Sequence, residues 1–325
     1  MKKINQLDLF SGIGGFHLGF EKAGYKVKSY FSEIDKHAIA VYKHKFKDSE
    51  YVGSVTDIRG EELPNIDLVT FGSPCQDFSL AGKRKGMSGD RSSLVLEAIR
   101  LISECRPGVF IWENVKGTFS SNSGEDFAAI LQAFTNIGGY RLEWQLLNTS
   151  WFLPQNRERI YLVGYSTTTK RNWRGVFPIG EVTKHIDEKI VNNTRKSSGR
   201  NLAHSRTLRK DISKCGSGDT YIKVYRRGDG KRISSTMVPT LTGTEINGGH
   251  HSDMAMIVQP NYRIRRLTTI ECERLQGFPD NHTEYGNYDG EVKKMSNTQR
   301  YKQCGNAVTT DVVQAIAEKI KPLFK

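Results

Sequence analysis

Hydrophobic and polar positions follow two different patterns along the first half of the chain. Short apolar runs such as INQLDLF (4–10) and IDLVTFG (66–72) have the length and composition of buried strands. Between them, FHLGFEKAGY (16–25) places apolar residues three and four positions apart, which is the spacing of an amphipathic helix. Because strands and helices alternate up to Tyr165, the pattern predicts a mostly parallel, doubly wound α/β sheet.

The same reasoning gives the remaining elements. Strands are expected over 26–34, around 54–59, and over 108–115, 140–150 and 157–165, and helices over 35–46, 92–107 and 124–138. Residues 166–262 are rich in Lys, Arg, Ser, Thr and Gly and contain short strand-like pieces, which is typical of a small, irregular β-rich domain. Helices return at 268–279 and 311–324, whereas the polar stretch 281–298 is expected to be a loop.

The charge is unevenly placed. Of a net charge of +13, most falls between Lys170 and Ser235, where 17 Lys and Arg stand against six Asp and Glu. A solvated surface is the plain alternative, but concentration in one segment favours a polyanionic partner such as nucleic acid. We expect no membrane span and no signal peptide, because long apolar runs are missing, and we expect a cytoplasmic, nucleoid-associated protein. Five widely spaced cysteines indicate neither disulfides nor a metal site.

One of these cysteines has an unusual setting. In GSPCQDFS (72–79), Cys75 follows a buried strand and a proline, with polar residues after it. Structural cysteines are usually buried among apolar neighbours and are inert. The carboxyl ends of strands are where open α/β sheets bind ligands. The pattern therefore indicates that Cys75 is presented as a nucleophile.

A glycine turn lies directly between the first predicted strand and helix, in DLFSGIGGF (8–16). Glycines let a backbone approach a ligand closely, although this is not the dinucleotide fingerprint. Glu33 lies at the end of the second strand, where a carboxylate can bind ribose hydroxyls, and Asp57 lies at the end of the expected third strand, where it can meet an adenine amino group. Either acid alone could be a turn residue or helix cap. Together with the turn they predict an adenosine-containing cofactor.

Two further groups are predicted at the same edge of the sheet. Glu113 in ENV (113–115) ends an apolar strand, which suits a proton donor or hydrogen-bond partner as well as a helix cap. Arg157 and Arg159 alternate at strand spacing and should project to one face.

Taken together, these blocks resemble the C5-cytosine-specific DNA methyltransferase family of the prokaryotic and phage, restriction–modification type. The matching blocks are DLFSGIGGF (8–16), SEID (32–35), GSPCQDFS (72–79), ENV (113–115), QNRERIYLVG (155–164), RRLTTIECERLQGFPD (265–280) and QRYKQCGNAV (299–308). They cover both ends of the chain and leave the basic region unmatched. The resemblance implies a Rossmann-like fold that transfers a methyl group from S-adenosylmethionine to carbon 5 of cytosine in double-stranded DNA.

The family also implies roles for these residues. A Cys75 thiolate would add to carbon 6 of the base, Glu113 would hold ring N3 and the amine, and Arg157 and Arg159 complete the catalytic set. The target base has to be flipped out of the duplex. The residues implied to line the cofactor site are Phe10, Gly12, Gly14, Phe16, Glu33, Ile34, Asp57, Pro74, Leu94, Asn306 and Val308. No metal is expected.

The resemblance divides the chain into three parts. Residues 1–165 with 299–325 would form the catalytic and cofactor-binding domain, 166–264 the target-recognition domain, and 265–298 a hinge. Residues 79–93 would close over DNA. The stretch 281–298 is longer than the family needs.

Three alternatives remain. An RNA cytosine methyltransferase of the same fold lacks support, because the Cys-Phe-Thr tripeptide of such relatives is missing. Intact Cys75, Glu113 and Arg159 weigh against an inactive DNA-binding regulator, and the glycine pattern weighs against a nicotinamide oxidoreductase. We expect a monomer. Its role is open between protection beside a cognate restriction endonuclease, phage self-protection and solitary regulation.

Overall fold

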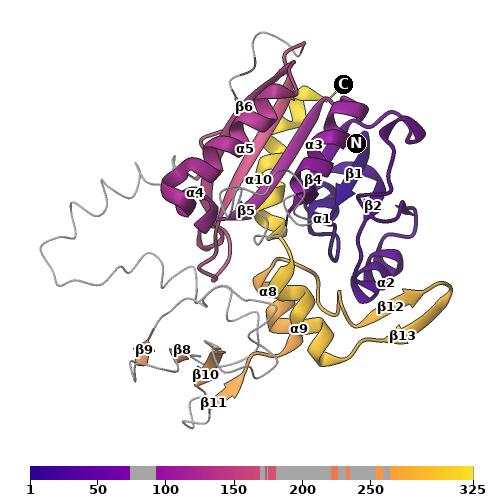
Figure 1. Ribbon diagram of the computed structural model, residues 1–325. Coiled ribbons are helices and arrows are strands. Elements are labelled where there is room, and N and C mark those ends of the chain that lie inside the picture. Colours follow the sequence, from indigo (N-terminus) through magenta and orange to yellow (C-terminus); the bar gives the residue numbers. More distant parts are fainter. Residues whose placement is uncertain are drawn as a thin grey trace, which may run out of the picture.

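The fold is described from a computed structural model, which covers residues 1–73, 93–168, 173, 175–180, 221–225, 232–234, 254–258 and 264–324 (Figure 1). The α/β part consists of β1 (Lys2–Leu9), α1 (Gly15–Lys22), β2 (Tyr25–Ser32), α2 (Lys36–Lys45), β3 (Glu50–Tyr51), β4 (Leu68–Gly72), α3 (Ser93–Cys105), β5 (Val109–Val115), α4 (Gly117–Ser120), α5 (Glu125–Asn136), β6 (Tyr140–Asn148), β7 (Glu158–Ser166) and α10 (Thr310–Ile320). The remaining elements are β8 (Tyr221–Tyr225), β9 (Arg232–Ser234), β10 (Met254–Val258), β11 (Ile264–Arg266), α8 (Thr269–Leu275), β12 (Tyr285–Tyr288), β13 (Glu291–Lys294) and α9 (Asn297–Asn306).

The central sheet contains seven of the described strands, in the order β3-β2-β1-β4-β5-β7-β6. The pairs from β3 to β5 are parallel, whereas β7 runs antiparallel to both neighbours. The chain moves outward from β1 to β3 and then starts again at β4, so its direction across the sheet reverses between β1 and β4. Open α/β sheets bind ligands at the carboxyl ends of strands beside such a reversal. The glycine turn after β1 and the segment after β4 both lie there, and the fold class is as predicted.

Helices cover both faces of this sheet (Figure 1). On one face α1 and α10 enclose a core that includes Ile111 and Ile316. On the other face α3 and α5 enclose Trp112, Leu101 and Phe134. Ile111 and Trp112 are successive residues of β5, and they enter opposite cores because side chains alternate across a strand. β5 is therefore buried on both faces, which explains its continuous apolar run.

Helices α1 and α10 approach each other closely at Gly19. A Cβ atom built on Gly19 would lie 2.4 Å from Val313 Cγ1, so any side chain here would push the helices apart. The last helix thus packs directly on the first one, which agrees with the prediction that the C-terminal block returns to the first domain.

The third strand differs from the prediction. β3 spans Glu50–Tyr51, and the expected strand around 54–59 is a turn instead. The Asp57 N–H donates to the Ser54 carbonyl at 2.9 Å, and the Ser54 and Thr56 hydroxyls bond each other. Short polar side chains that bond locally compete with a strand ladder. Asp57 therefore lies in a turn beyond β3 rather than at its end.

The prediction of a loop over 281–298 is wrong. β12 and β13 form an antiparallel hairpin in which Tyr288 pairs with Glu291. Asp289 and Gly290, which join the strands, have φ values of 51° and 103°. Asp-Gly is a favoured two-residue hairpin turn because both positions require positive φ. The polar composition concealed this signal, and β12 packs along α2 (Figure 1).

The rest of the C-terminal half contains a second sheet and a helical pair. The described strands β8 to β11 form an antiparallel sheet in the order β11-β10-β8-β9, in keeping with the predicted β-rich domain. Helices α8 and α9 pack around Cys272 and Cys304, which are buried packing residues as expected. Burial raises the pKa of Cys272 to about 12, so its thiol stays protonated. The boundary drawn at residue 299 falls inside α9.

Candidate active site

The glycine turn after β1 is held in a conformation that few residue types adopt. Gly12 and Gly14 have φ values of 54° and 82°, and Phe10 beside them has a φ of 51°. A Cβ built on Gly14 would lie 2.3 Å from the Phe46 ring, whereas a Cβ on Gly12 would meet nothing within 4 Å. Gly14 is therefore required by packing, and Gly12 leaves open space above the turn.

Glu33 connects this turn to the end of β2. Its Oε2 accepts the Gly12 N–H at 2.9 Å, and its Oε1 accepts the N–H groups of Ile34 and Asp35 at 2.8 and 3.0 Å. A carboxylate has about four acceptor positions, so Glu33 can still accept from a ligand hydroxyl. The Ile34 side chain next to it is 81% exposed. A carboxylate beside an exposed aliphatic group suits a ligand that carries both hydroxyls and an apolar ring.

The other residues predicted for the cofactor are distributed unevenly. Phe16 is buried in the core between the sheet and α10, and Val308 lies 2.6 Å from a Cβ built on Gly15. Leu94 is half-buried in the first turn of α3, whereas Asp57 and Asn306 are exposed. Pro74 lies outside the described residues.

Glu113 and Arg159 meet at the carboxyl edge of the sheet. Arg159 Nε lies 3.2 Å from Glu113 Oε1, and the two side chains are only 14% and 10% exposed. A Cβ built on Gly72 would lie 3.1 Å from Glu113 Oε2 and 3.9 Å from Val308 Cγ1. The structure thus gathers an ionic pair, the end of β4 and one predicted cofactor residue in one place. Cys75, three residues beyond Gly72, lies outside the described residues, as do most of 79–93.

Arg157 does not join this pair. Its guanidinium is buried and donates to the Gly305 carbonyl at 3.2 Å and to the Ala307 carbonyl at 2.8 Å. Arg157 precedes β7, so strand alternation did not apply to it as the sequence suggested. Its contacts join the start of β7 to the end of α9, where Asn306 lies, and to Ala307 directly after it.

A buried polar network lies behind the glycine turn, and sequence reasoning missed it. Asp8 is completely buried and accepts the Thr70 hydroxyl at 2.7 Å and the Tyr42 hydroxyl at 3.2 Å. Tyr42 Oη also lies 2.7 Å from Ser29 Oγ and 3.2 Å from His17 Nδ1. Burial raises the pKa of Asp8 to about 8. The sequence signal that could have revealed this network is the presence of polar residues, such as Asp8 and Thr70, within otherwise apolar strands.

The same turn is supported from the far end of the chain. The His282 ring donates through Nε2 to the Ile13 carbonyl at 2.9 Å. Burial lowers the pKa of His282 to about 4, so the ring is neutral and acts as a donor. The segment predicted as a hinge therefore braces the glycine turn.

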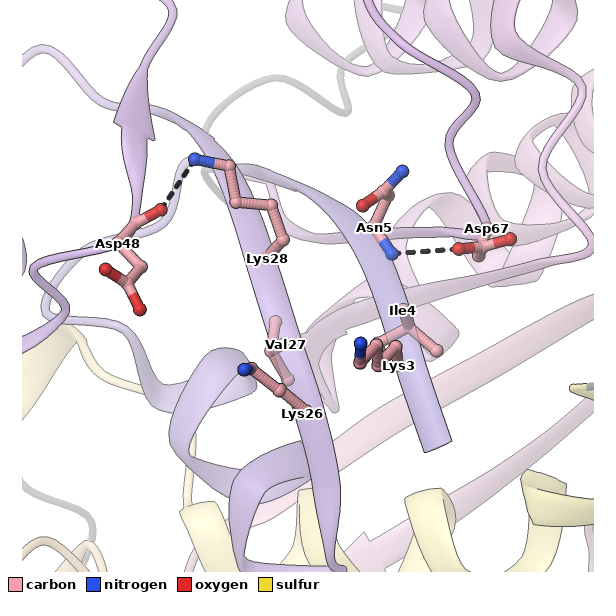
Figure 2. Close-up of a pocket in the computed structure, with 8 residues that line it drawn as sticks. All are labelled: Lys3, Ile4, Asn5, Lys26, Val27, Lys28, Asp48 and Asp67. Atoms are coloured by element: carbon pink, nitrogen blue, oxygen red, sulfur yellow. Dashed lines mark hydrogen bonds between the residues drawn. The ribbon is translucent and has the colours of Figure 1, made fainter. Parts of the chain in front are cut away.

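A hollow of about 490 Å³ lies at the amino ends of β1 and β2 (Figure 2). Lys28 Nζ donates to the Asp48 carbonyl at 2.8 Å, and the Asn5 N–H donates to Asp67 Oδ2 at 2.8 Å (Figure 2). None of the predicted site residues lines it, so it is separate from the candidate active site. Within the described residues no cluster of His, Cys, Asp or Glu could hold a metal ion. The described helices also include none that is long and apolar enough to span a bilayer.

Comparisons with known proteins agree with this geometry. The chain is 33% identical to the Type II methyltransferase M.Bsp6I of Bacillus sp. (strain RFL6) over 318 residues, which is 96% of each chain. It is 35% identical to the Type II methyltransferase M1.ScrFI of Lactococcus lactis subsp. cremoris, over 98% of this chain and 78% of that one.

Solved structures share the fold. The S. pombe Dnmt2 methyltransferase superposes with a TM-score of 0.69 at 19% identity, over 98% of this chain and 99% of that one. The Entamoeba histolytica methyltransferase EhMeth gives a TM-score of 0.63 at 18% identity over the full length of both chains. The sequence model of the C-5 cytosine-specific DNA methylases matches residues 4–322. The chain therefore belongs to the C-5 cytosine-specific DNA methylase family and is a DNA (cytosine-5-)-methyltransferase.

Proposed function

We propose that the chain methylates a flipped-out cytosine through a covalent bond between Cys75 and carbon 6 of the base. The observation that carries this proposal is the Glu113–Arg159 pair beside Gly72, at the strand end that leads to Cys75. Carbon 5 of cytosine is a poor nucleophile. Addition of the Cys75 thiolate to carbon 6 breaks the ring's aromaticity and places electron density on carbon 5.

Glu113 holds the base during this step: its carboxyl group accepts a hydrogen bond from the exocyclic amine and, in its protonated form, donates one to ring N3. Arg159 keeps the Glu113 carboxyl group in place from a distance of 3.2 Å. Carbon 5 would receive the methyl group with the neutral thioether of the cofactor as the leaving group. Carbon 5 then loses its proton to water, the bond between carbon 6 and sulfur breaks, and the ring double bond re-forms with release of the thiolate. Arg157 acts as a positioning residue in this scheme, because its guanidinium holds the turn before α10.

The predicted cofactor residues fit S-adenosylmethionine, which supplies an electrophilic methyl group when bound. Glu33 has acceptor capacity left for ribose hydroxyls, and Ile34 offers an exposed aliphatic surface to the adenine. Open space above Gly12 lets the ligand approach the backbone. Asp57 is exposed; its Oδ1 accepts the Thr56 hydroxyl at 3.1 Å, and its second carboxylate oxygen can accept from an adenine amino group. The other members of the proposed site are Phe10, Gly14, Phe16, Pro74, Leu94, Asn306 and Val308.

Residues 166–264 form the proposed target-recognition domain, and their basic charge supports contact with the phosphates of double-stranded DNA. We place the protein in the cytoplasm, on the nucleoid, as a monomer. Relatives named Type II methyltransferases support a role beside a cognate restriction endonuclease.

The test begins with incubation of the protein, unmethylated genomic DNA and S-adenosylmethionine, followed by cytosine-resolved conversion sequencing. Methylation confined to one short motif supports the proposal. Good DNA binding without methylation would favour an RNA substrate or an inactive regulator.

The nucleophile is tested with Cys75→Ser, which should abolish methylation and leave DNA binding intact. Cys105→Ser is the matched control, because burial raises the pKa of Cys105 to about 11 and the thiol is unreactive. Retained turnover in Cys75→Ser would contradict the covalent mechanism.

A further inference from the structure

Ser73 is the last described residue before Pro74 and Cys75, and side chains from β5 hold it in place. The Trp112 indole N–H donates to Ser73 Oγ at 3.0 Å. Asn114 Nδ2 lies 3.1 Å from the same hydroxyl and 3.2 Å from the Ser73 carbonyl. All three residues are buried.

Covalent geometry carries this restraint forward along the chain. The Ser73 carbonyl belongs to the peptide bond with Pro74, and a planar peptide turns as one unit. Asn114 restrains that carbonyl, and Trp112 and Asn114 both restrain the Ser73 hydroxyl, so the residue at which the chain leaves β4 is held by its backbone and by its side chain. A proline follows Ser73, and a proline restricts the residue before it to extended backbone conformations, which further limits the backbone conformation of Ser73.

Trp112 is a rigid anchor for this purpose. Its side chain is completely buried and lies against Phe127 and Phe134, with ring centroids 6.5 and 5.8 Å away. In the parallel pair of β4 and β5, Phe71 is in register with Trp112 and Gly72 with Glu113. β5 therefore carries Glu113 on one face, and on its other face Trp112 and Asn114 bond Ser73, two residues before Cys75.

We propose that Trp112 and Ser73 form a positioning pair that sets the place of the Cys75 nucleophile relative to Glu113. The inference rests on the proposed role of Cys75. Neither residue touches the base. The hydrogen bond between them keeps the exit from β4 in register with the strand that carries Glu113.

The test uses Trp112→Phe, which removes the N–H but keeps an aromatic ring, together with Ser73→Ala and the double variant. Trp144→Phe, at an exposed tryptophan on β6, and Ser120→Ala, at an exposed serine, are matched controls. The full-length proteins are assayed with unmethylated DNA and radiolabelled S-adenosylmethionine. Cys75 alkylation by iodoacetamide is followed in parallel by peptide mass spectrometry.

We expect each single variant to lower kcat by roughly 10- to 100-fold, because displacement of a reacting group by about 1 Å costs up to that much. KM for S-adenosylmethionine and for DNA should stay unchanged, a split that general loss of structure would not produce. The double variant should lose no more than the more impaired single one, and alkylation of Cys75 should change in rate in all three.

Two outcomes would overturn the inference: kcat within about twofold of the controls, or losses that multiply in the double variant. A different result would contradict the covalent mechanism itself: methylation by Cys75→Ser at the wild-type rate. That result would be independent of the rates measured for Trp112→Phe.

Discussion

Asp8 provides the sharpest prediction on stability. Its carboxyl group is completely buried behind the glycine turn, and burial raises its pKa to about 8 from its ordinary value of 3.8. Between these two pH values the folded chain keeps a proton that the unfolded chain releases. Raising the pH therefore favours unfolding, by about 1.4 kcal/mol per pH unit.

His282 acts in the opposite sense over part of this range. Burial lowers its pKa from 6.5 to about 4, so it removes stability as the pH falls below 6.5 and contributes little pH dependence above that value. Between pH 6.5 and pH 8 the change in stability due to Asp8 therefore exceeds the opposing change due to His282. The stability contribution from Asp8, complete below pH 3.8, should fall by on the order of 2 kcal/mol across this interval.

The perturbation is Asp8→Asn, which matches the protonated acid in charge and retains one acceptor and one donor for Thr70 and Tyr42. Urea unfolding is followed by tryptophan fluorescence at pH 6.5 and pH 8, with the exposed Asp48→Asn as control. We expect wild type and control to lose on the order of 2 kcal/mol between the two pH values and Asp8→Asn to lose much less. Equal losses in all three proteins would refute a protonated Asp8 in the folded chain.

Three further predictions concern the site and the packing. Gly72→Ala should lower kcat about tenfold or more with little change in stability, because the new Cβ lies 3.1 Å from Glu113 Oε2 and displaces the carboxylate; steady-state kinetics with unchanged kcat would contradict this. Gly19→Ala should destabilise the fold by about 1–3 kcal/mol through overpacking against Val313, and Val313→Ala should restore part of the loss; thermal unfolding of both variants and the double variant measures it, and an unaltered melting temperature would show that α1 and α10 can separate freely. Exchange of residues 170–262 for those of another family member should change the methylated motif in conversion sequencing, and an unchanged motif would refute the recognition domain.

Much of the fold follows from the sequence, because periodicity is a local property. Alternating apolar runs and helical spacings place β1, β2, β4 and β5 within about two residues of their observed bounds. The parallel arrangement then brings strand ends to one edge, so that Glu33 meets the glycine turn and Glu113 lies beside the end of β4. Local reasoning failed where composition misled it, as in the β12–β13 hairpin, whose Asp-Gly turn is itself a local signal.

Only the tertiary structure decides which distant residues meet and which groups lose contact with water. Arg157 bonds carbonyls 148 and 150 positions away, and His282 bonds Ile13 across 269 positions. The pKa of Asp8 is raised only because a closed core surrounds its carboxyl group. The hydrogen bond from Trp112 to Ser73 forms only because β5 pairs in register with β4. Strand patterns specify that side chains alternate between faces, but burial and hydrogen bonding depend on what packs against each face, which no single segment contains.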